Sequence, residues 1–304
     1  MSDHPSPTVG ELGEQYLLER FAAAPVGGDV IVGPGDDCAV CDTGSDRLTL
    51  LKTDCVVGGV HFTLDEDFRR VGHKALARAI SDIGAMGGTP RHALVTLMLP
   101  PTTTLAQVDA LYDGLRAVGE RFGVQIVGGE TTSAPPPHRD ALMVNIALTG
   151  DVDRDHVTTR AGGEPGDALF VTGVLGGSIA GHHLDFIPRL AEGQWLAANG
   201  ATAMMDLSDG LAKDLPRLAR ASGCDAHVDP TALPLRGDST PTDALNDGED
   251  FELLVAVPED HVRALLINWR SAFPDTPLTR IGRLVELGSA DATPLHGGFD
   301  HFSD

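Results

Sequence analysis

The chain has 304 residues, of which 42% are hydrophobic and 22% charged, with 44 acidic against 22 basic residues. This length provides one large or two ordinary domains with a buried core. The formal net charge of −22 argues against binding DNA, RNA or anionic membranes by charge. If the ligand is itself an anion, a divalent cation is needed to offset the repulsion between that ligand and so acidic a protein.

Cysteine usage and the N-terminal residues bear on the compartment. Cys38 and Cys41 form a lone C-x-x-C, and Cys55 and Cys224 stand alone. Without a second pair or spaced histidines, we interpret all four as packed free thiols in a reducing cytoplasm rather than as zinc ligands. The first residues lack the apolar core of a signal peptide, and no apolar run approaches the ~20 residues that span a bilayer. We expect a cytoplasmic protein.

The first half of the chain alternates helix and strand patterns. We expect helices over 10–24, 69–88 and 104–123, the last two ending at glycine. Strands are expected within 29–40, 47–57, 91–100, 124–132 and 140–152. The first of these segments contains a glycine-rich loop, and 124–132 runs from a strand into another such loop.

A change of composition at 153–167 separates a second half with the same alternation. Strand-to-helix patterns occupy 168–184, 201–223 and 251–273, and strands are expected at 224–235 and 278–287. The mixture in both halves predicts an α/β (α+β) protein with two domains, residues 1–150 and 151–304.

Carboxylates recur beside small residues where strands end. Loops at strand ends are where α/β folds build their sites, and glycine lets a phosphate or metal approach the backbone closely. Mg²⁺ prefers oxygen ligands and commonly bridges carboxylates to phosphates. The pattern therefore indicates metal-assisted phosphoryl chemistry, on these residues: Asp36, Asp37, Asp54, Asp82, Glu130, Asp206, Asp209, Glu249 and Asp250.

Each loop also has a purely structural interpretation. Asp and Gly are common turn residues, and Asp209 is placed to cap a helix that begins near Gly210. No P-loop, protein-kinase motif set, G-x-S-x-G elbow or H-E-x-x-H is present to specify the chemistry further. His61 follows a Gly-Gly turn beside the carboxylate loops, which makes it a candidate ligand contact.

Taken in order, the motifs resemble the thiamine-monophosphate kinase family, within the aminoimidazole-ribonucleotide-synthetase superfamily of ATP-binding proteins. The matching stretches run nearly end to end and include "GPGDDCAV", "TDCVVGGVHF", "GHKALARAISDIGAMGGTP", "GGETT", "MDLSDGL", "GEDFEL" and "GGFDHF". The resemblance implies ATP-dependent, Mg²⁺-dependent phosphorylation of thiamine monophosphate. It also implies a homodimer in which the N-terminal mixed sheets form a barrel, followed by a sandwich-like C-terminal α/β domain.

The resemblance further implies roles for individual residues. The expected ATP contacts are Gly128, Gly129, Glu130, Arg160 and Ser208. The expected Mg²⁺ ligands are Asp36, Thr53, Asp54, Asp82, Glu130, Asp206 and Asp209. The expected contacts to thiamine monophosphate are His61, Glu249 and Phe299. No separate general base is expected, because the acceptor phosphate is already an anion; the role of Asp37 stays open between ligand and loop support.

The sequence departs from the family pattern in several places. Glu130 stands where an Asp is usual, Lys52 where a small polar residue is common, and Ser133 where an Arg usually follows. The segment 181–199 is also shorter than is typical. These departures put the number of metal ions in question more than the fold.

Two alternatives remain at this point. Another enzyme of the superfamily would use a different acceptor, but the reactive Cys of selenophosphate synthetase and the C-terminal Cys of the hydrogenase-maturation relative have no counterpart here, and the purine-synthesis relative lacks the "DHF" tail. A non-catalytic nucleotide-binding relative would fit Lys52 and Glu130, but unbalanced clustered carboxylates would then cost stability.

Overall fold

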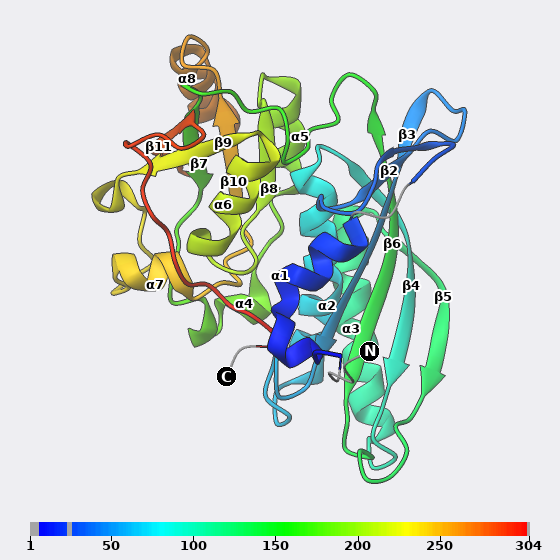
Figure 1. Cartoon of the computed structure of the whole chain (residues 1–304). Coiled ribbons are helices and arrows are strands. Elements are labelled where there is room, and N and C mark those ends of the chain that lie inside the picture. The colour runs from blue at the N-terminus through cyan, green and yellow to red at the C-terminus, as the bar shows by residue number, and fades with distance from the viewer. Residues whose placement is uncertain (1–5, 23–25, 303–304) are drawn as a thin grey trace, which may run out of the picture.

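Two sheets, each with its own helices, make up the part of the chain that the computed structural model describes, residues 6–22 and 26–302 (Figure 1). The first sheet has six strands in the order β1-β2-β3-β6-β4-β5. Only β4 and β5 pair in parallel, so the sheet is mixed, as expected. Its strands are β1 (Val30–Val32), β2 (Ala39–Cys41), β3 (Arg47–Val57), β4 (Thr89–Met98), β5 (Gln125–Thr132) and β6 (Met143–Asp153).

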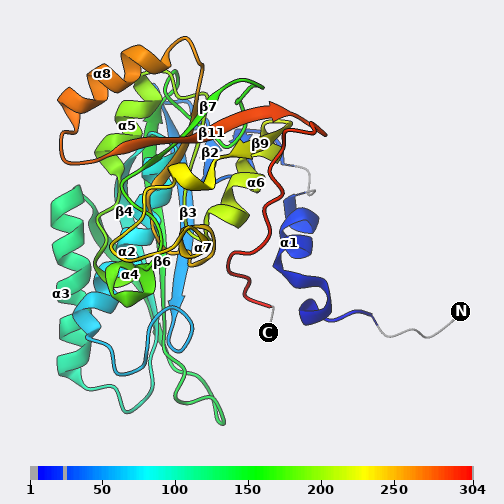
Figure 2. The ribbon, with the colours of Figure 1, turned by 90° about the vertical axis from the view of Figure 1, so that its left-hand side faces the viewer.

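Helices α2 (Phe68–Ala85) and α3 (Leu105–Phe122) cover one face of this sheet (Figure 2). Thr104 and Gln107 form a reciprocal capping box at the start of α3, and Gly123 ends the helix in the left-handed conformation. The two helices can approach closely because Gly114 has no side chain; a Cβ there would lie 1.9 Å from the carbonyl oxygen of Arg69. This contact fixes α2, which carries the expected site residue Asp82.

The second sheet is antiparallel, in the order β8-β10-β7-β11-β9, and is covered on both faces. Leucines of α6 pack with one face, and Trp195 and Trp269 of α5 and α8 pack with the other. The strands are β7 (Ala168–Thr172), β8 (Ala203–Asp206), β9 (Cys224–Val228), β10 (Leu253–Val257) and β11 (Leu278–Glu286). The helices are α4 (His182–Asp185), α5 (Leu190–Ala198), α6 (Leu211–Ala221), α7 (Pro241–Asn246) and α8 (Val262–Ala272).

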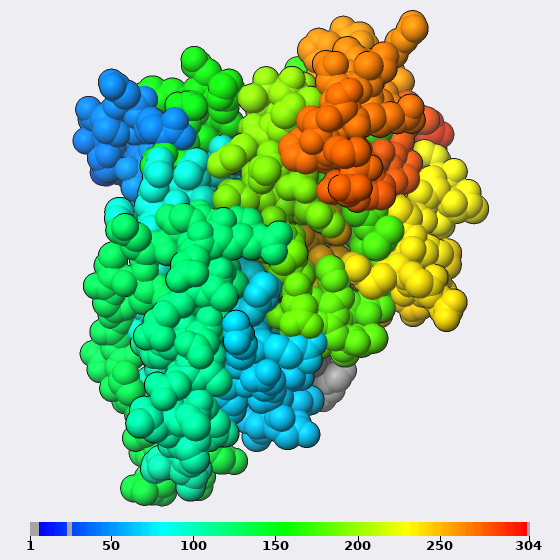
Figure 3. Space-filling view, turned by 180° about the vertical axis from the view of Figure 1, so that it is seen from behind, coloured from blue at the N-terminus to red at the C-terminus, as the bar shows by residue number. Residues whose placement is uncertain are grey.

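Helix α2 joins the two halves. It packs against α4, α5 and β8 as well as against the first sheet, and the contact with the green segment around α4 is visible from behind (Figure 3). Phe186 stacks on Phe251 at 4.0 Å, and the Ser81 hydroxyl of α2 donates to Asp206 at the end of β8. The far end of α2 therefore lies where strands of both sheets end.

The expected class, a mixed α/β protein with two sheets, is confirmed, and the helices and strands expected in the first half are present among the described residues. The first helix is α1 (Val9–Ala22), and residues 23–24 of its expected range, 10–24, lie outside the described residues. One segment differs: 124–132 was expected to leave its strand for a loop, whereas β5 continues to Thr132. The absence of a side chain at Gly129 permits this pairing, since a Cβ there would lie 1.8 Å from the carbonyl oxygen of Val95 on β4. Helices α5 and α7 were not predicted. No helix in the described ranges is long and apolar enough to cross a membrane.

Candidate active site between the two sheets

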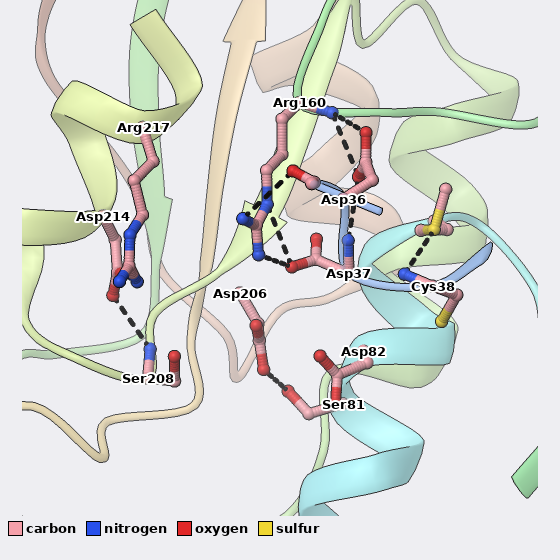
Figure 4. A network of polar contacts seen from close by, with 12 residues as sticks. Asp36, Asp37, Cys38, Ser81, Asp82, Arg160, Asp206, Ser208, Asp214 and Arg217 are labelled. Atoms are coloured by element: carbon pink, nitrogen blue, oxygen red, sulfur yellow. Dashed lines mark hydrogen bonds and ion pairs between the residues drawn. The ribbon is translucent and has the colours of Figure 1, made fainter. Parts of the chain in front are cut away.

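Three buried carboxylates from distant parts of the chain meet beside the end of α2 (Figure 4). Asp37 comes from the loop between β1 and β2, Asp82 from α2, and Asp206 from the end of β8. One ligand oxygen from each lies within 4.8 Å of the others. The grouping of Asp82 with Asp206 follows the expectation from the sequence, and Asp37, whose role was left open, is the third member.

Burial makes this cluster costly when all its members are ionised. Burial, followed by the charge of Asp37, raises the pKa of Asp206 to about 7. Burial also raises the pKa of Asp82 well above its ordinary value, although Lys52 opposes the shift. One Asp37 oxygen, Oδ2, is buried with no hydrogen-bond partner among the described residues. Like charges this close favour a bound cation, and an orphaned oxygen beside two carboxylates fits an oxygen-preferring ion such as Mg²⁺.

Asp36 lies at the edge of the cluster and is held by the backbone. It accepts hydrogen bonds from its neighbour Asp37 N at 3.0 Å and from Arg160 N at 3.1 Å. Burial and the charge of Asp37 raise the pKa of Asp36 to about 6. The Arg160 guanidinium donates to Asp37 through Nε at 3.2 Å and also contacts it through Nη2. Its expected contact with ATP stays a prediction.

Two protein cations lie beside the carboxylates that α2 and β3 supply. The Lys52 ammonium donates to Asp82 Oδ1 at 2.6 Å, and Arg78 Nη2 lies 3.2 Å from Asp54 Oδ1. Strand alternation directs Thr53 to the opposite face of β3, where its hydroxyl donates to Asn145 at 3.1 Å. Asp54 therefore faces the cluster, whereas the Thr53 side chain does not.

The "MDLSDG" loop places Asp209 away from the three-carboxylate cluster. Arg217 lies 2.7 Å from Asp209 Oδ2 and Lys213 lies 3.4 Å from it. Burial alone raises the pKa of Asp209, but these two cations outweigh burial and leave it below its ordinary value. The structure gives α6 no side-chain N-cap at Gly210, so Asp209 is not the capping residue.

The loop itself is supported by a residue that the sequence reasoning did not single out. Asp214 accepts hydrogen bonds from the backbone N–H groups of Ser208 and Asp209, at 3.0 and 2.9 Å. It is one helical turn into α6 and fully buried. Its spacing after "DLSDG" was the available signal, since a carboxylate in the first turn of a helix can accept from exposed N–H groups.

The three residues expected at thiamine monophosphate line one cavity of about 490 Å³. His61, Glu249 and Phe299 share it with His301, which sequence reasoning did not assign a role. Phe299 meets the His301 ring edge-on at 4.8 Å, and the His301 and His61 rings lie 5.4 Å apart. Phe299 N also donates to the carbonyl oxygen of Asp209, so the C-terminal tail closes against the "DLSDG" loop.

Buried charged groups determine the protonation state of His61 in this cavity. Lys74, fully buried, forms an ion pair with Glu249 and also donates to the carbonyl oxygen of His61. Burial and the nearby cations Arg78 and Lys74 lower the pKa of His61 to about 3, so its ring is neutral near pH 7. Because His61 Nδ1 accepts from Val57 N at 3.0 Å, Nε2 carries the proton.

A second cavity of about 690 Å³ adjoins the first. Both are lined by Arg78, Ser208, Asp209 and His301. The second contains most of the expected metal and ATP residues: Asp36, Thr53, Asp54, Asp82, Arg160, Asp206, Ser208 and Asp209. The structure therefore offers two ligand spaces that meet at shared residues, one acidic and one lined by aromatic rings.

Gly128, Gly129 and Glu130 are not brought to this site within one chain. They lie on the edge strand β5, and two strands, β4 and β6, separate β5 from Asp54 on β3. Glu130 is exposed and accepts from its neighbour Thr131 N. Their expected ATP and metal contacts stay predictions.

Comparison with known proteins places the chain. The family described as AIR synthase related protein matches over its N-terminal domain at residues 35–152 and its C-terminal domain at 164–293. Thiamine-monophosphate kinase from Rhodopirellula baltica is 36% identical over 89% of this chain and 87% of its own length. The Escherichia coli K12 enzyme is 32% identical over 90% and 93%. The chain belongs to the thiamine-monophosphate kinase family.

Solved structures agree with this assignment to the thiamine-monophosphate kinase family. The complex of AaThiL with AMPPCP and TMP has a TM-score of 0.84 and 27% identity, covering 98% of this chain and 100% of the other. Thiamine-monophosphate kinase from Stenotrophomonas maltophilia K279a gives 0.72 and 29%, covering 89% and 93%. Hydrogenase maturation protein HypE in complex with ATP gives 0.67 at 20% identity, over 89% and 84%, which shows a shared fold alone.

Proposed function

We propose that this protein transfers the γ-phosphoryl group of ATP directly to thiamine monophosphate and so forms thiamine diphosphate. The observation that carries the proposal is the pair of adjoining cavities, which share Arg78, Ser208 and Asp209. A nucleotide in the acidic cavity and a phosphorylated acceptor in the aromatic one would present their phosphates to each other at these shared residues. AaThiL, similar over almost the whole chain, binds an ATP analogue and TMP together.

Mg²⁺ is the cofactor that this site suits. Asp37, Asp82 and Asp206 would hold it, with Asp36 and Asp54 beside them. Bound Mg²⁺ would neutralise the phosphates and stabilise the charge on the transferring group. The orphaned oxygen of Asp37 supports this assignment.

The chain's own side chains position the reactants and complete the charge balance. Arg78 lines both cavities, where its guanidinium pairs with Asp54, and its buried Nε has no partner among the described residues. A phosphate at the junction of the two cavities would lie beside this cation. The backbone N–H groups of Ser208 and Asp209 are taken by Asp214, which fixes the loop that separates the two ligands. Neutral His61 is not required as a base, because the acceptor phosphate is ionised at pH 7.

The aromatic cavity suits the flat, cationic rings of thiamine. Phe299, His301 and His61 offer ring faces and edges, and Glu66, Asp247 and Glu249 also line the cavity. A cationic ring is stabilised over an aromatic face and near a carboxylate. The proposal therefore places the thiazolium and pyrimidine rings here and the phosphate toward Arg78.

We further propose a homodimer formed through the open face of the first sheet. Among the described residues, helices α2 and α3 pack on one face of this sheet. The other face exposes Leu51, Leu94 and Val127, which are 45%, 47% and 57% exposed. A second copy on this face would bury these side chains. It would also allow Gly128, Gly129 and Glu130 of one copy to contribute to the active site of the second copy.

The dimer is tested with a charge placed on that face. Val127→Glu is expected to convert a dimer into a monomer, because a carboxylate buried without a partner costs several kcal/mol. Ile267→Glu, at a similarly exposed position on α8, is the matched control and is expected to stay dimeric. Light scattering after size-exclusion chromatography measures the mass. A monomeric wild type, or a dimeric Val127→Glu variant, contradicts this interface.

We also place the protein in the cytoplasm. Cys38, Cys41, Cys55 and Cys224 are all free, which suits a compartment that keeps thiols reduced.

The activity is tested by measuring ADP production from ATP and Mg²⁺ with and without thiamine monophosphate. The proposal predicts turnover that depends on thiamine monophosphate. ATP binding without acceptor-dependent turnover would favour a non-catalytic relative, and turnover with a different acceptor alone would favour another enzyme of the superfamily.

A further inference from the structure

Lys52 lies among carboxylates that the proposed function assigns to metal. On β3, alternation turns Leu50, Lys52 and Asp54 to the face that α2 covers. Asp82 and Arg78 face them from α2, one helical turn apart. Each element therefore supplies a cation to a carboxylate of the other: Lys52 of β3 lies 2.6 Å from Asp82 of α2, and Arg78 of α2 lies 3.2 Å from Asp54 of β3.

The ammonium of Lys52 is a built part of this site rather than a surface charge. Its side chain is 20% exposed, and that of Asp82 is 9% exposed. Lys52 lines the acidic cavity together with Asp36, Asp82 and Asp206. Asp82 Oδ1 accepts the hydrogen bond from this ammonium, and Asp82 is one of the three clustered carboxylates that could hold a metal ion.

The local charges leave room for fewer metal ions than the number of carboxylates suggests. Five carboxylates gather here: Asp36, Asp37, Asp54, Asp82 and Asp206. Three cations, Lys52, Arg78 and Arg160, form ion pairs with members of this group. The remaining formal excess is two negative charges, which a single divalent ion balances before a nucleotide brings charges of its own.

We propose that the Lys52 ammonium is a resident cation of the metal site and takes the place of one divalent ion at Asp82 Oδ1, so that Asp82 shares the remaining ion with Asp37 and Asp206 through its other oxygen. A metal bound to Asp82 Oδ1 would lie about 2 Å from that oxygen. It would then sit against an ammonium that already occupies the oxygen, and the two cations would repel. The inference deepens the proposed function and rests on it, since it concerns the number of ions at the same site.

Counting bound Mn²⁺ tests the inference without any measurement of turnover. Mn²⁺ favours the same oxygen ligands as Mg²⁺ and is counted by electron paramagnetic resonance, here with the full chain and a non-hydrolysable ATP analogue. The variants are Lys52→Ser, which removes the ammonium, and Lys52→Arg, which keeps a cation. Arg91→Ser removes a cation that pairs with Asp151 outside the two cavities, and serves as the matched control.

The inference predicts that Lys52→Ser binds one more Mn²⁺ per chain than the wild type. Lys52→Arg and Arg91→Ser are expected to bind the wild-type number. An unchanged count in Lys52→Ser overturns the inference, as does an absence of bound Mn²⁺ in both the wild type and this variant.

A measurement on the wild type keeps the inference testable if Lys52→Ser fails to fold. Anomalous diffraction from crystals soaked in Mn²⁺ is expected to show Lys52 on Asp82 Oδ1 and no metal on that oxygen. A Mn²⁺ ion on Asp82 Oδ1 with Lys52 displaced overturns the inference. Neither readout depends on thiamine monophosphate, so a failure here is distinct from a failure of the proposed kinase activity.

Discussion

Neighbouring cations decide how each buried carboxylate of the site behaves. Asp209 lies between Lys213 and Arg217, so its pKa stays below its ordinary value despite burial. Asp206 has a hydroxyl donor in Ser81, but burial and then the nearby carboxylate of Asp37 raise its pKa to about 7. Asp209 is therefore an anion whose counter-ions are side chains of the protein, whereas Asp206 favours binding of a cation from solution.

Asp54→Asn and Asp209→Asn are each expected to lower turnover by about 100-fold or more while leaving the fold intact. Each change removes a charge that faces the proposed phosphate site, where charge stabilisation supplies most of the rate. Turnover and circular dichroism measure the two effects. Asp113→Asn, on the exposed side of α3, is the control and is expected to match the wild type. Wild-type rates in both site variants contradict the assignment.

Asp250 gives a pH dependence that is separate from the metal cluster. Burial raises the pKa of Asp250 to about 6, although Gly176 N and Arg236 oppose the shift. Between its ordinary value of 3.8 and this value, the folded state holds more protons than the unfolded state. Stability from this group is therefore fully present below pH 3.8 and lost as the pH rises through about 6.

Asp250→Asn removes that titration. The free energy of unfolding of the variant is expected to change less between pH 4 and pH 7 than that of the wild type, by about 2–3 kcal/mol. Urea denaturation at several pH values measures this difference. Equal pH dependence in the two proteins shows that the carboxyl is not perturbed by burial.

At the scale of elements, helix α2 determines where the site lies. It presents Arg78, Ser81 and Asp82 to strands of both sheets, and α3 holds it in place through a close contact at Gly114. A side chain at Gly114 has no room, because the nearest atom is the backbone carbonyl oxygen of Arg69.

Gly114→Ala is expected to push α2 from α3 and destabilise the fold by about 1–3 kcal/mol. Gly10→Ala, in helix α1 (Val9–Ala22), is the matched control, because a Cβ there meets nothing within 4 Å. Thermal denaturation compares the two. A Gly114→Ala variant as stable as the wild type contradicts the account of this helix contact.

Much of this architecture could be predicted from the sequence, because long periodic segments such as α2 and α3 carry their own signals. Asp82 and Asp206 were identified because small residues adjoin them. Asp206 does end a strand, β8, but Asp82 lies within helix α2 and not at the end of a strand. The structure was needed to identify Asp37 and Arg78. The sequence does not show which of the adjacent carboxylates, Asp36 or Asp37, enters the cluster, and a charged residue within a helix is ordinarily expected to face solvent. The direction of Thr53 depends on strand register, and the pairing of Lys52 with Asp82 depends on helix-to-sheet packing.

At the scale of the whole molecule, the site exists because the two halves meet along α2. Each half contributes carboxylates to the lining of the acidic cavity, and the C-terminal tail contributes Phe299 and His301 to the aromatic one. Gly128, Gly129 and Glu130 are the predicted residues that one chain does not bring to the site, and their strand, β5, is part of the sheet face proposed for dimerisation. The expected division near residue 150 stays a prediction, with the first sheet ending at Asp153 and the second beginning at Ala168.

The most direct test of the account follows the γ-phosphate of labelled ATP in the presence of Mg²⁺ and thiamine monophosphate. The account predicts that the label appears in thiamine diphosphate, in step with ADP, and that Asp206→Asn slows this transfer by about 100-fold or more. Label that stays in ATP, or appears only as free phosphate while thiamine monophosphate is unchanged, would contradict the proposed reaction.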